Sequence, residues 1–212
     1  MLELTFEVTG ATAEPYAVVP TISLELRVTE STGAKIGAVA LRAQIRIEPQ
    51  RRRYGADEEM RLFELFGTTG QWGESLRPFL WTEVATTIGM FTGETTVSLP
   101  ITCTYDLEVS GAKYFHALSD GVVPLVVLFN GSVFSAHDGA MSVEPLPWHL
   151  EARYRLPATL WRETMDRYFP DGGWLRLSRQ SLDALQRVKN RLAMPTWDGT
   201  VEMLLKEAGE SE

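Results

Sequence analysis

The fold is decided by the stretch Thr95–Val109, which reads TTVSLPITCTYDLEV. From Val97 to Val109, every second residue is aliphatic, aromatic or cysteine, and the residues between them are polar apart from Pro100. A period of two over this length predicts an extended strand with one buried face and one solvent-exposed face.

A second apolar segment follows at Gly121–Phe134, which reads GVVPLVVLFNGSVF. It is the expected antiparallel partner of the first strand. Its residues are apolar on both faces, so we expect it to be covered twice, by a sheet layer and by another element.

Three more amphipathic strands precede these two, at Leu2–Thr9, Thr21–Glu30 and Val39–Glu48. The last two are separated by the short loop Ser31–Lys35, which contains a glycine. Two alternating segments joined in this way predict an antiparallel hairpin.

The rest of the chain switches between patterns. We expect a short helical insertion near residues 57–77, a strand at Phe79–Ile88, and edge strands near residues 140–156, because Pro145 and Pro147 cannot donate to a sheet. From Pro157 the apolar period changes to about 3.6, which predicts helices that cover the second face of Gly121–Phe134. The predicted fold class is α+β: one domain over residues 1–212, with a mostly antiparallel β-sandwich or curved sheet over 1–156 and C-terminal helices packed on it over 157–212.

Charge and composition exclude several classes of protein. The net charge is −8 and the pI about 5.0, which disfavours a general nucleic-acid binder. A single cysteine excludes an intramolecular disulfide and multi-cysteine metal sites. The first residues lack a basic segment, and no apolar run reaches the roughly 20 residues that span a bilayer, so we expect a cytoplasmic protein without membrane insertion.

Catalytic patterns are weak. His116, His137 and His149 do not share the spacings that place two metal ligands on one face. Cys103 lies on an apolar strand face, where a thiol behaves as a small hydrophobic group. We therefore predict no catalytic residues, no metal site and no cofactor.

The strongest binding candidate is a group of arginines: Arg42 and Arg46 on one strand face, with Arg27 on the strand expected to face it, and Arg51, Arg52 and Arg53 directly after. Guanidinium groups bind carboxylates in pairs, so an acidic partner is the natural ligand. The alternative is that Arg51–Arg53 form ion pairs with the acidic helix start at Asp57–Glu59 of the same molecule.

Trp148, between two prolines and an expected edge strand, is predicted to be an exposed docking residue.

The sequence resembles a bacterial family of unknown function encoded in nickel–iron hydrogenase gene clusters of high-GC Gram-positive bacteria. The matching stretches are Ile45–Tyr54, Leu99–Glu108, Ala112–Leu118 and Trp161–Leu177. The resemblance implies an accessory role near hydrogenase assembly and supplies no catalytic residues. A looser likeness, in architecture alone, is to the export chaperone SecB.

Together these observations predict a non-enzymatic protein–protein interaction or assembly module, associated with a nickel–iron hydrogenase. Its expected partner is a hydrogenase subunit or maturation factor, and a homo-oligomer is compatible with the sequence. The first alternative is a SecB-like holdase for unfolded clients. A small-molecule carrier or an uncharacterised enzyme is a further alternative.

Overall fold

The computed structural model describes residues 3–137, 140–170, 172 and 175–210, without the side chains of residues 136, 137, 140 and 141. The contacts divide the chain into two compact units, residues 1–174 and 175–212. The two units are described separately below.

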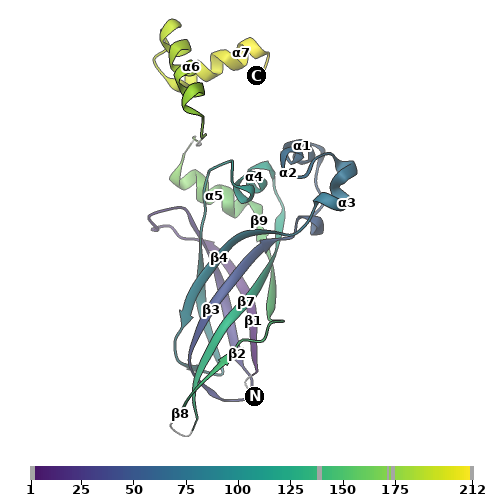
Figure 1. The fold of residues 1–212 in the computed structure, drawn as a ribbon, viewed down its shortest axis with the longest axis vertical. Helices are drawn as coiled ribbons and strands as arrows, with labels where there is room; N and C mark the ends of the chain where they lie inside the picture. The colour runs from purple at the N-terminus through teal and green to yellow at the C-terminus, as the bar shows by residue number, and fades with distance from the viewer. Residues whose placement is uncertain (1–2, 138–139, 171, 173–174, 211–212) are drawn as a thin grey trace. The chain divides into compact units, whose positions relative to one another are not determined.

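The first unit is a β-sandwich of two antiparallel sheets (Figure 1). β1 contacts β9 and β4 contacts β6, so the two sheets meet along both sides. The three-stranded sheet has the order β1 (Leu4–Ala13), β2 (Thr21–Glu30), β6 (Glu94–Thr102). The six-stranded sheet has the order β4 (Phe79–Ile88), β3 (Lys35–Ile47), β7 (Val122–His137), β8 (Ala140–Pro145), with β5 (Phe91–Thr92) paired to β3 and β9 (Glu151–Pro157) paired to β7.

The core lies between the two sheets and is built from the alternating residues of each strand. Ile22, Leu24, Leu26 and Val28 of β2 are fully buried, and the inward residues of β3 face them from the other sheet. Burying one apolar face of each sheet against the other is what holds the two layers together. The predicted α+β fold with an antiparallel sandwich is confirmed.

The predicted hairpin between the second and third strands is wrong, because β2 and β3 belong to different sheets. The chain crosses from one sheet to the other directly after Glu30, whose side chain is buried. Its carboxylate accepts hydrogen bonds from the Thr32 hydroxyl (2.6 Å), the Thr32 amide (3.1 Å) and the Ala34 amide (2.8 Å). These bonds fix residues 31–34 as an arch between layers instead of a tight hairpin turn.

The predicted pairing of Thr95–Val109 with Gly121–Phe134 is also wrong. β6 ends at Thr102 and pairs with β2, whereas β7 pairs with β3, β8 and β9. Beyond β6 the chain leaves the sheet and enters α4 (Ser110–Ala117). The alternating pattern continues past the strand because Tyr105 packs on the Trp161 ring of a helix, with centroids 5.8 Å apart.

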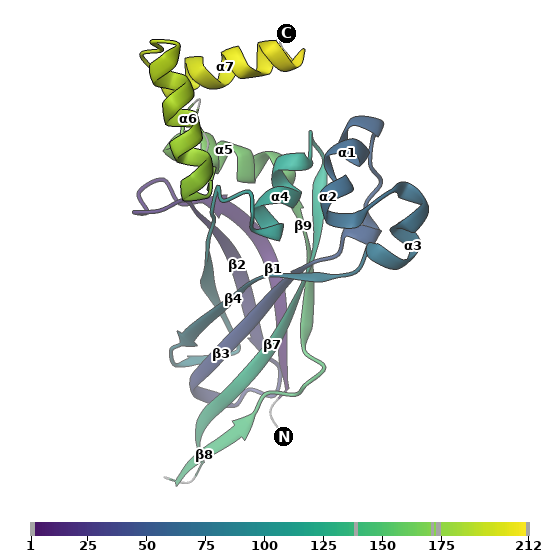
Figure 2. The ribbon, with the colours of Figure 1, turned by 45° about the horizontal axis from the view of Figure 1, so that its top comes forward.

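The helices of the first unit gather at one end of the sandwich (Figure 2). The insertion expected near residues 57–77 is present as η1 (Pro49–Arg51), α1 (Ala56–Arg61), α2 (Phe63–Phe66), η2 (Thr69–Gln71) and α3 (Trp72–Ser75). α5 (Ala158–Tyr168) contacts α4, β1, β2 and β9. The C-terminal helix of this unit therefore covers the end of the sandwich and not the second face of β7.

The second face of β7 is covered in another way. Val126 on that face is buried, and its neighbours in register are Arg46 on β3 and Arg153 on β9. Long arginine side chains cover apolar surface with their methylene groups while the guanidinium stays near water. This arrangement replaces the helical cover that we expected for the strand.

The second unit contains α6 (Arg179–Arg191) and α7 (Trp197–Ala208), which contact each other. Side-chain hydroxyls cap both helices: Ser178 accepts from the Ser181 amide, and Thr196 accepts from the Gly199 amide. Among the described residues of this unit, Thr200 alone is buried. None of the helices in the described parts of the chain combines the length and the apolar character needed to cross a bilayer.

Candidate binding site

The candidate site is built around Arg52, directly after β3 and η1. Its side chain is 8% exposed. One terminal nitrogen, Nη2, lies 2.5 Å from Glu58 Oε1, and the other, Nη1, donates to the carbonyl oxygens of Asp120 (2.8 Å) and Val122 (3.2 Å). Arg52 thus joins the start of α1 to the start of β7, while its buried Nε has no hydrogen-bond partner in the described structure.

Glu58 completes this buried ion pair. Its carboxylate also accepts hydrogen bonds from the amides of Ser119 (2.8 Å) and Gly55 (3.3 Å). Burial raises the pKa of the carboxyl, but the hydrogen bonds and the charge of Arg52 outweigh it, so the net pKa of Glu58 is below its usual value. The charge of Arg52 is therefore neutralised within the molecule.

Gly121 is required where Arg52 crosses to β7. Its φ is +76°, a conformation that favours glycine, and a Cβ at this position would lie 3.3 Å from Arg52 Nη1. A glycine here lets the guanidinium reach the carbonyl groups on either side.

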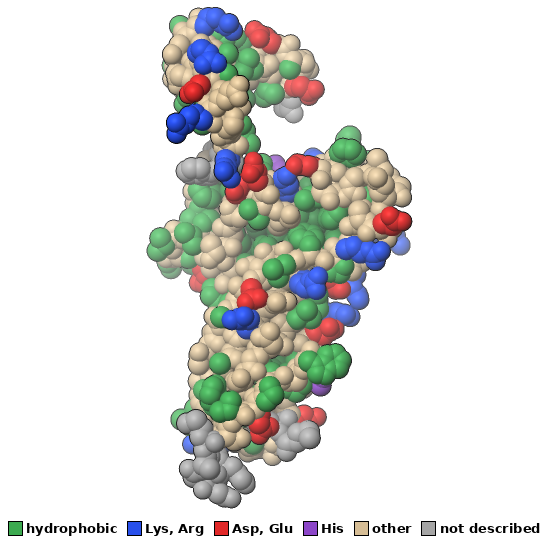
Figure 3. Space-filling model, viewed as in Figure 1, with side chains coloured by type: hydrophobic (Ala, Val, Ile, Leu, Met, Phe, Trp, Pro, Cys, Tyr) green, Lys and Arg blue, Asp and Glu red, His purple; other side chains and the backbone are tan. Residues whose placement is uncertain are grey.

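A pocket of about 420 Å³ opens beside this ion pair. Figure 3 shows basic side chains, with acidic ones among them, along the side of the sandwich near the helical end. Four arginines and two carboxylates leave the pocket lining with a net charge of +2, in a chain of net charge −8. The charged residues of the lining are Arg51, Arg52, Arg53, Arg155, Glu58 and Asp120.

The exposed arginines of the pocket differ in how they are paired. Arg51 Nε lies 3.0 Å from a carboxylate oxygen of Glu48, which also faces Arg153 at 3.9 Å. The side chains of Arg53 and Arg155 are exposed and make no hydrogen bond or ion pair within the described part of the chain. The pocket therefore presents two uncompensated guanidinium groups to solvent.

The remaining arginines of the predicted group lie elsewhere. Arg42 Nε pairs with Glu83 at 3.2 Å, and Arg46 Nη2 donates to the Pro78 carbonyl at 3.2 Å. Arg27 lies on the other sheet, where it pairs with Glu7 and Glu94. The structure thus brings Arg51, Arg52 and Arg53 together in one pocket lining, which does not include Arg27, Arg42 or Arg46.

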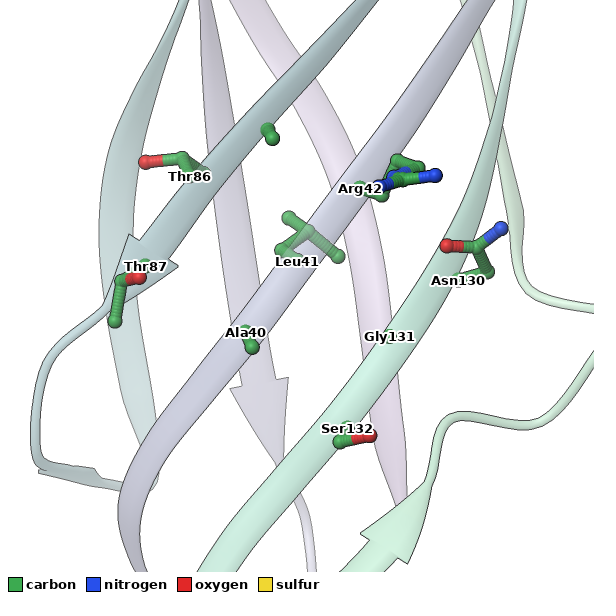
Figure 4. Close-up of a pocket in the computed structure, with 9 residues that line it drawn as sticks. Ala40, Leu41, Arg42, Thr86, Thr87, Asn130, Gly131 and Ser132 are labelled. Carbon is green, nitrogen blue, oxygen red and sulfur yellow. The ribbon is translucent and has the colours of Figure 1, made fainter.

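Arg42 lines a shallow trough on the outer face of the six-stranded sheet (Figure 4). The trough has a volume of about 450 Å³ and is lined by small residues, including Ala40, Gly131 and Ser132. Gly131 has φ +145°, and a Cβ there would lie 2.0 Å from the Ala40 carbonyl oxygen. The trough therefore follows from the close approach of β3 and β7, and its one charged lining residue is already paired.

Trp148 is 92% exposed, in the connection between β8 and β9. Its ring contacts that of His149, with centroids 5.8 Å apart. The exposure fits the predicted docking residue, and its role in binding stays a prediction.

Sequence reasoning missed Arg155, which completes the pocket from β9. The sequence does indicate which way the Arg155 side chain points. In the alternating segment Glu151–Pro157, Arg153 and Arg155 occupy the face opposite Ala152 and Leu156. The alternation alone does not predict that Arg155 joins the pocket, because the place of this strand depends on the pairing of β9 with β7.

Other reactive groups do not form a site in the described structure. Burial raises the pKa of the Cys103 thiol to about 12. His116 is on α4, and burial together with Arg61 and Arg162 lowers the pKa of its imidazole. The side chain of His137 lies outside the described residues. Among the residues described, no group of three or more His, Cys, Asp or Glu side chains could hold a metal ion.

A sandwich of two antiparallel sheets with an arginine-lined pocket defines the class of molecule, an α+β protein with a candidate anion-binding surface. The chain belongs to a family of unknown function, DUF6084, whose model matches residues 1–212. No functionally curated protein matches the sequence.

Solved structures show distant likenesses in fold. The CARDB domain of the PF1109 protein from Pyrococcus furiosus is 12% identical, with a TM-score of 0.30, and the match covers 73% of this chain and 91% of that domain. Beta-glucosidase from Kluyveromyces marxianus is 10% identical, with a TM-score of 0.28, and the match covers 73% of this chain and 15% of the enzyme. Similarities of this size carry no functional argument.

Proposed function

We propose that this protein is a non-enzymatic interaction or assembly module that docks an acidic partner protein at the arginine pocket. One observation carries the proposal: at the same pocket of a chain whose net charge is −8, Arg53 and Arg155 have no side-chain partner among the residues that the structure describes. Guanidinium forks recognise carboxylates, and unpaired arginines are common anchors at protein interfaces.

The proposed partner is a subunit or maturation factor of a nickel–iron hydrogenase. This part rests on the resemblance to a bacterial family encoded in nickel–iron hydrogenase gene clusters. Trp148 is the proposed second contact, because a tryptophan exposed in this way supplies a large area for burial in an interface.

The test is affinity isolation of the tagged chain from its native host. We expect a hydrogenase subunit or maturation factor to be enriched, and its recovery to fall at least tenfold with the double variant Arg53→Glu and Arg155→Glu. The matched control is Arg27→Glu with Arg42→Glu, which changes the net charge equally but away from the pocket. Isolation without any hydrogenase component overturns the hydrogenase association, and equal recovery with both double variants overturns the pocket as the docking site.

The holdase alternative is tested with the same purified chain. The proposed function predicts no suppression of aggregation for several unrelated unfolded clients, measured by light scattering. Suppression at stoichiometric amounts would contradict it.

A further inference from the structure

The four arginines of the pocket lining differ in whether their guanidinium groups are already bound within the molecule. Arg52 uses both terminal nitrogens inside the molecule, on Glu58 and on two carbonyl oxygens. Arg51 is held by Glu48 through its Nε. Among the residues that the structure describes, none pairs with the guanidinium N–H groups of Arg53 or Arg155, so a ligand would be bound by these two side chains.

These two side chains come from separate elements. Arg53 lies in the connection from η1 to α1, and Arg155 lies on β9, opposite Pro124 of β7 in the ladder. The backbone at Arg53 is held by the Arg52–Glu58 ion pair of the preceding residue. The backbone at Arg155 is held by the pairing of β9 with β7. Two guanidinium groups that come from different elements to one pocket match a ligand with two separate negative charges.

The carboxylates in the pocket lining further restrict the kind of anion that the pocket can bind. Glu58 is compensated by Arg52, but Asp120 lies in the same lining and would repel a compact dianion such as phosphate more strongly than a singly charged carboxylate at the same distance. Two carboxylates spaced along a peptide can instead each meet one guanidinium group. The lining also includes Val122 and Pro124, against which the carbon atoms of an acidic side chain can pack.

We infer that Arg53 and Arg155 form a clamp for two carboxylates of an extended acidic peptide segment, and that Arg52 positions the clamp without contacting the ligand. This inference rests on the proposed function and names the chemistry that the docking site recognises. It goes beyond the docking proposal because it assigns separate roles to the four arginines and excludes phosphate as the preferred ligand.

The test uses the full chain and a fluorescein-labelled hexaglutamate peptide, with hexaglutamine as the uncharged probe, followed by fluorescence anisotropy at low ionic strength. We expect saturable binding of hexaglutamate, no binding of hexaglutamine, and at least a tenfold loss of affinity with Arg53→Gln and Arg155→Gln together. The control, Arg27→Gln with Arg42→Gln, changes the net charge equally and should alter the affinity less than twofold.

Inorganic phosphate is the competitor. Displacement of the peptide by phosphate at equal ionic strength, set with sodium chloride in the reference, would overturn the choice of carboxylate. Equal losses with both double variants, or no binding of hexaglutamate, would overturn the clamp. A clamp that fails here while partner isolation still depends on Arg53 and Arg155 would leave the proposed docking function standing.

Discussion

At the scale of single residues, Arg52 shows how a side chain with the signature of a binding residue serves the fold. Its guanidinium is buried against Glu58, and both groups also hydrogen-bond backbone atoms in the segment that leads into β7. Removing one member of a buried ion pair leaves the other charge without compensation, which costs several kcal/mol. The alternative prediction, that these arginines pair with the acidic helix start of the same molecule, therefore holds for Arg52. The exposed side chain of Arg53 has no such partner among the described residues.

This pair gives the first prediction. Glu58→Gln should lower the free energy of unfolding by about 3 kcal/mol at pH 7, because Arg52 is left buried without its counter-ion. The folded-state pKa of Glu58 is lowered, so its contribution is present above the unfolded pKa of about 4.3 and is lost as the pH falls through the folded value. Urea unfolding at several pH values measures both effects, and Glu59→Gln, one position away, is the control. A difference between native and Glu58→Gln chains that grows toward low pH would contradict this account.

Cys103 gives the second residue-level prediction. The thiol is buried, and its pKa is raised to about 12, so the thiolate is scarce at neutral pH. We expect reaction with a thiol reagent such as DTNB to be at least a hundredfold slower in the native chain than in urea. Rapid labelling without denaturant would show that the segment around Cys103, directly after β6, opens readily.

At the scale of elements, periodicity located most strands but not their partners. The alternation in Thr21–Glu30 identifies β2 and its buried face, and nothing in it distinguishes pairing with β3 from packing against β3 in the opposite sheet. The structure adds hydrogen bonds from Thr32 and Ala34 to Glu30, which hold the arch between the two sheets. The candidate site is limited in the same way. Arg51–Arg53 are adjacent in the sequence and could be recognised as a cluster. Arg155 joins them through the pairing of β9 with β7, which no local sequence pattern encodes.

The close approach of β3 and β7 gives a prediction for one element. Gly131→Ala should destabilise the sandwich by about 3 kcal/mol or prevent folding, because the new Cβ would meet the Ala40 carbonyl oxygen. Gly89→Ala is the matched control, since no atom lies within 4 Å of its added Cβ, and it should change stability by less than about 1 kcal/mol. Thermal unfolding followed by circular dichroism compares the two, and equal midpoints would refute the strain argument.

At the scale of the whole molecule, the two units differ in how much they bury. The sandwich has a continuous core, whereas in the described part of residues 175–212 the apolar side chains of α6 and α7 are half-buried or exposed. Local stability follows the number of buried apolar contacts. The helical unit should therefore open independently of the sandwich.

Hydrogen exchange measured by mass spectrometry tests this prediction on the intact chain. Peptides from α6 and α7 should exchange at least a hundredfold faster than peptides from β2 and β3. Comparable protection in both units would show that they unfold together.

The most direct measurement of the central claim, that Arg53 and Arg155 are the free docking groups of the pocket, is the NMR spectrum of the arginine Nε–H groups during titration with hexaglutamate. The chain has 16 arginines, and single Arg→Lys substitutions assign the relevant signals. The account predicts saturable shifts for Arg53 and Arg155, and unchanged signals for Arg27 and Arg42, which are already paired with carboxylates. Shifts spread evenly over the arginines, or confined to Arg27 and Arg42, would contradict it.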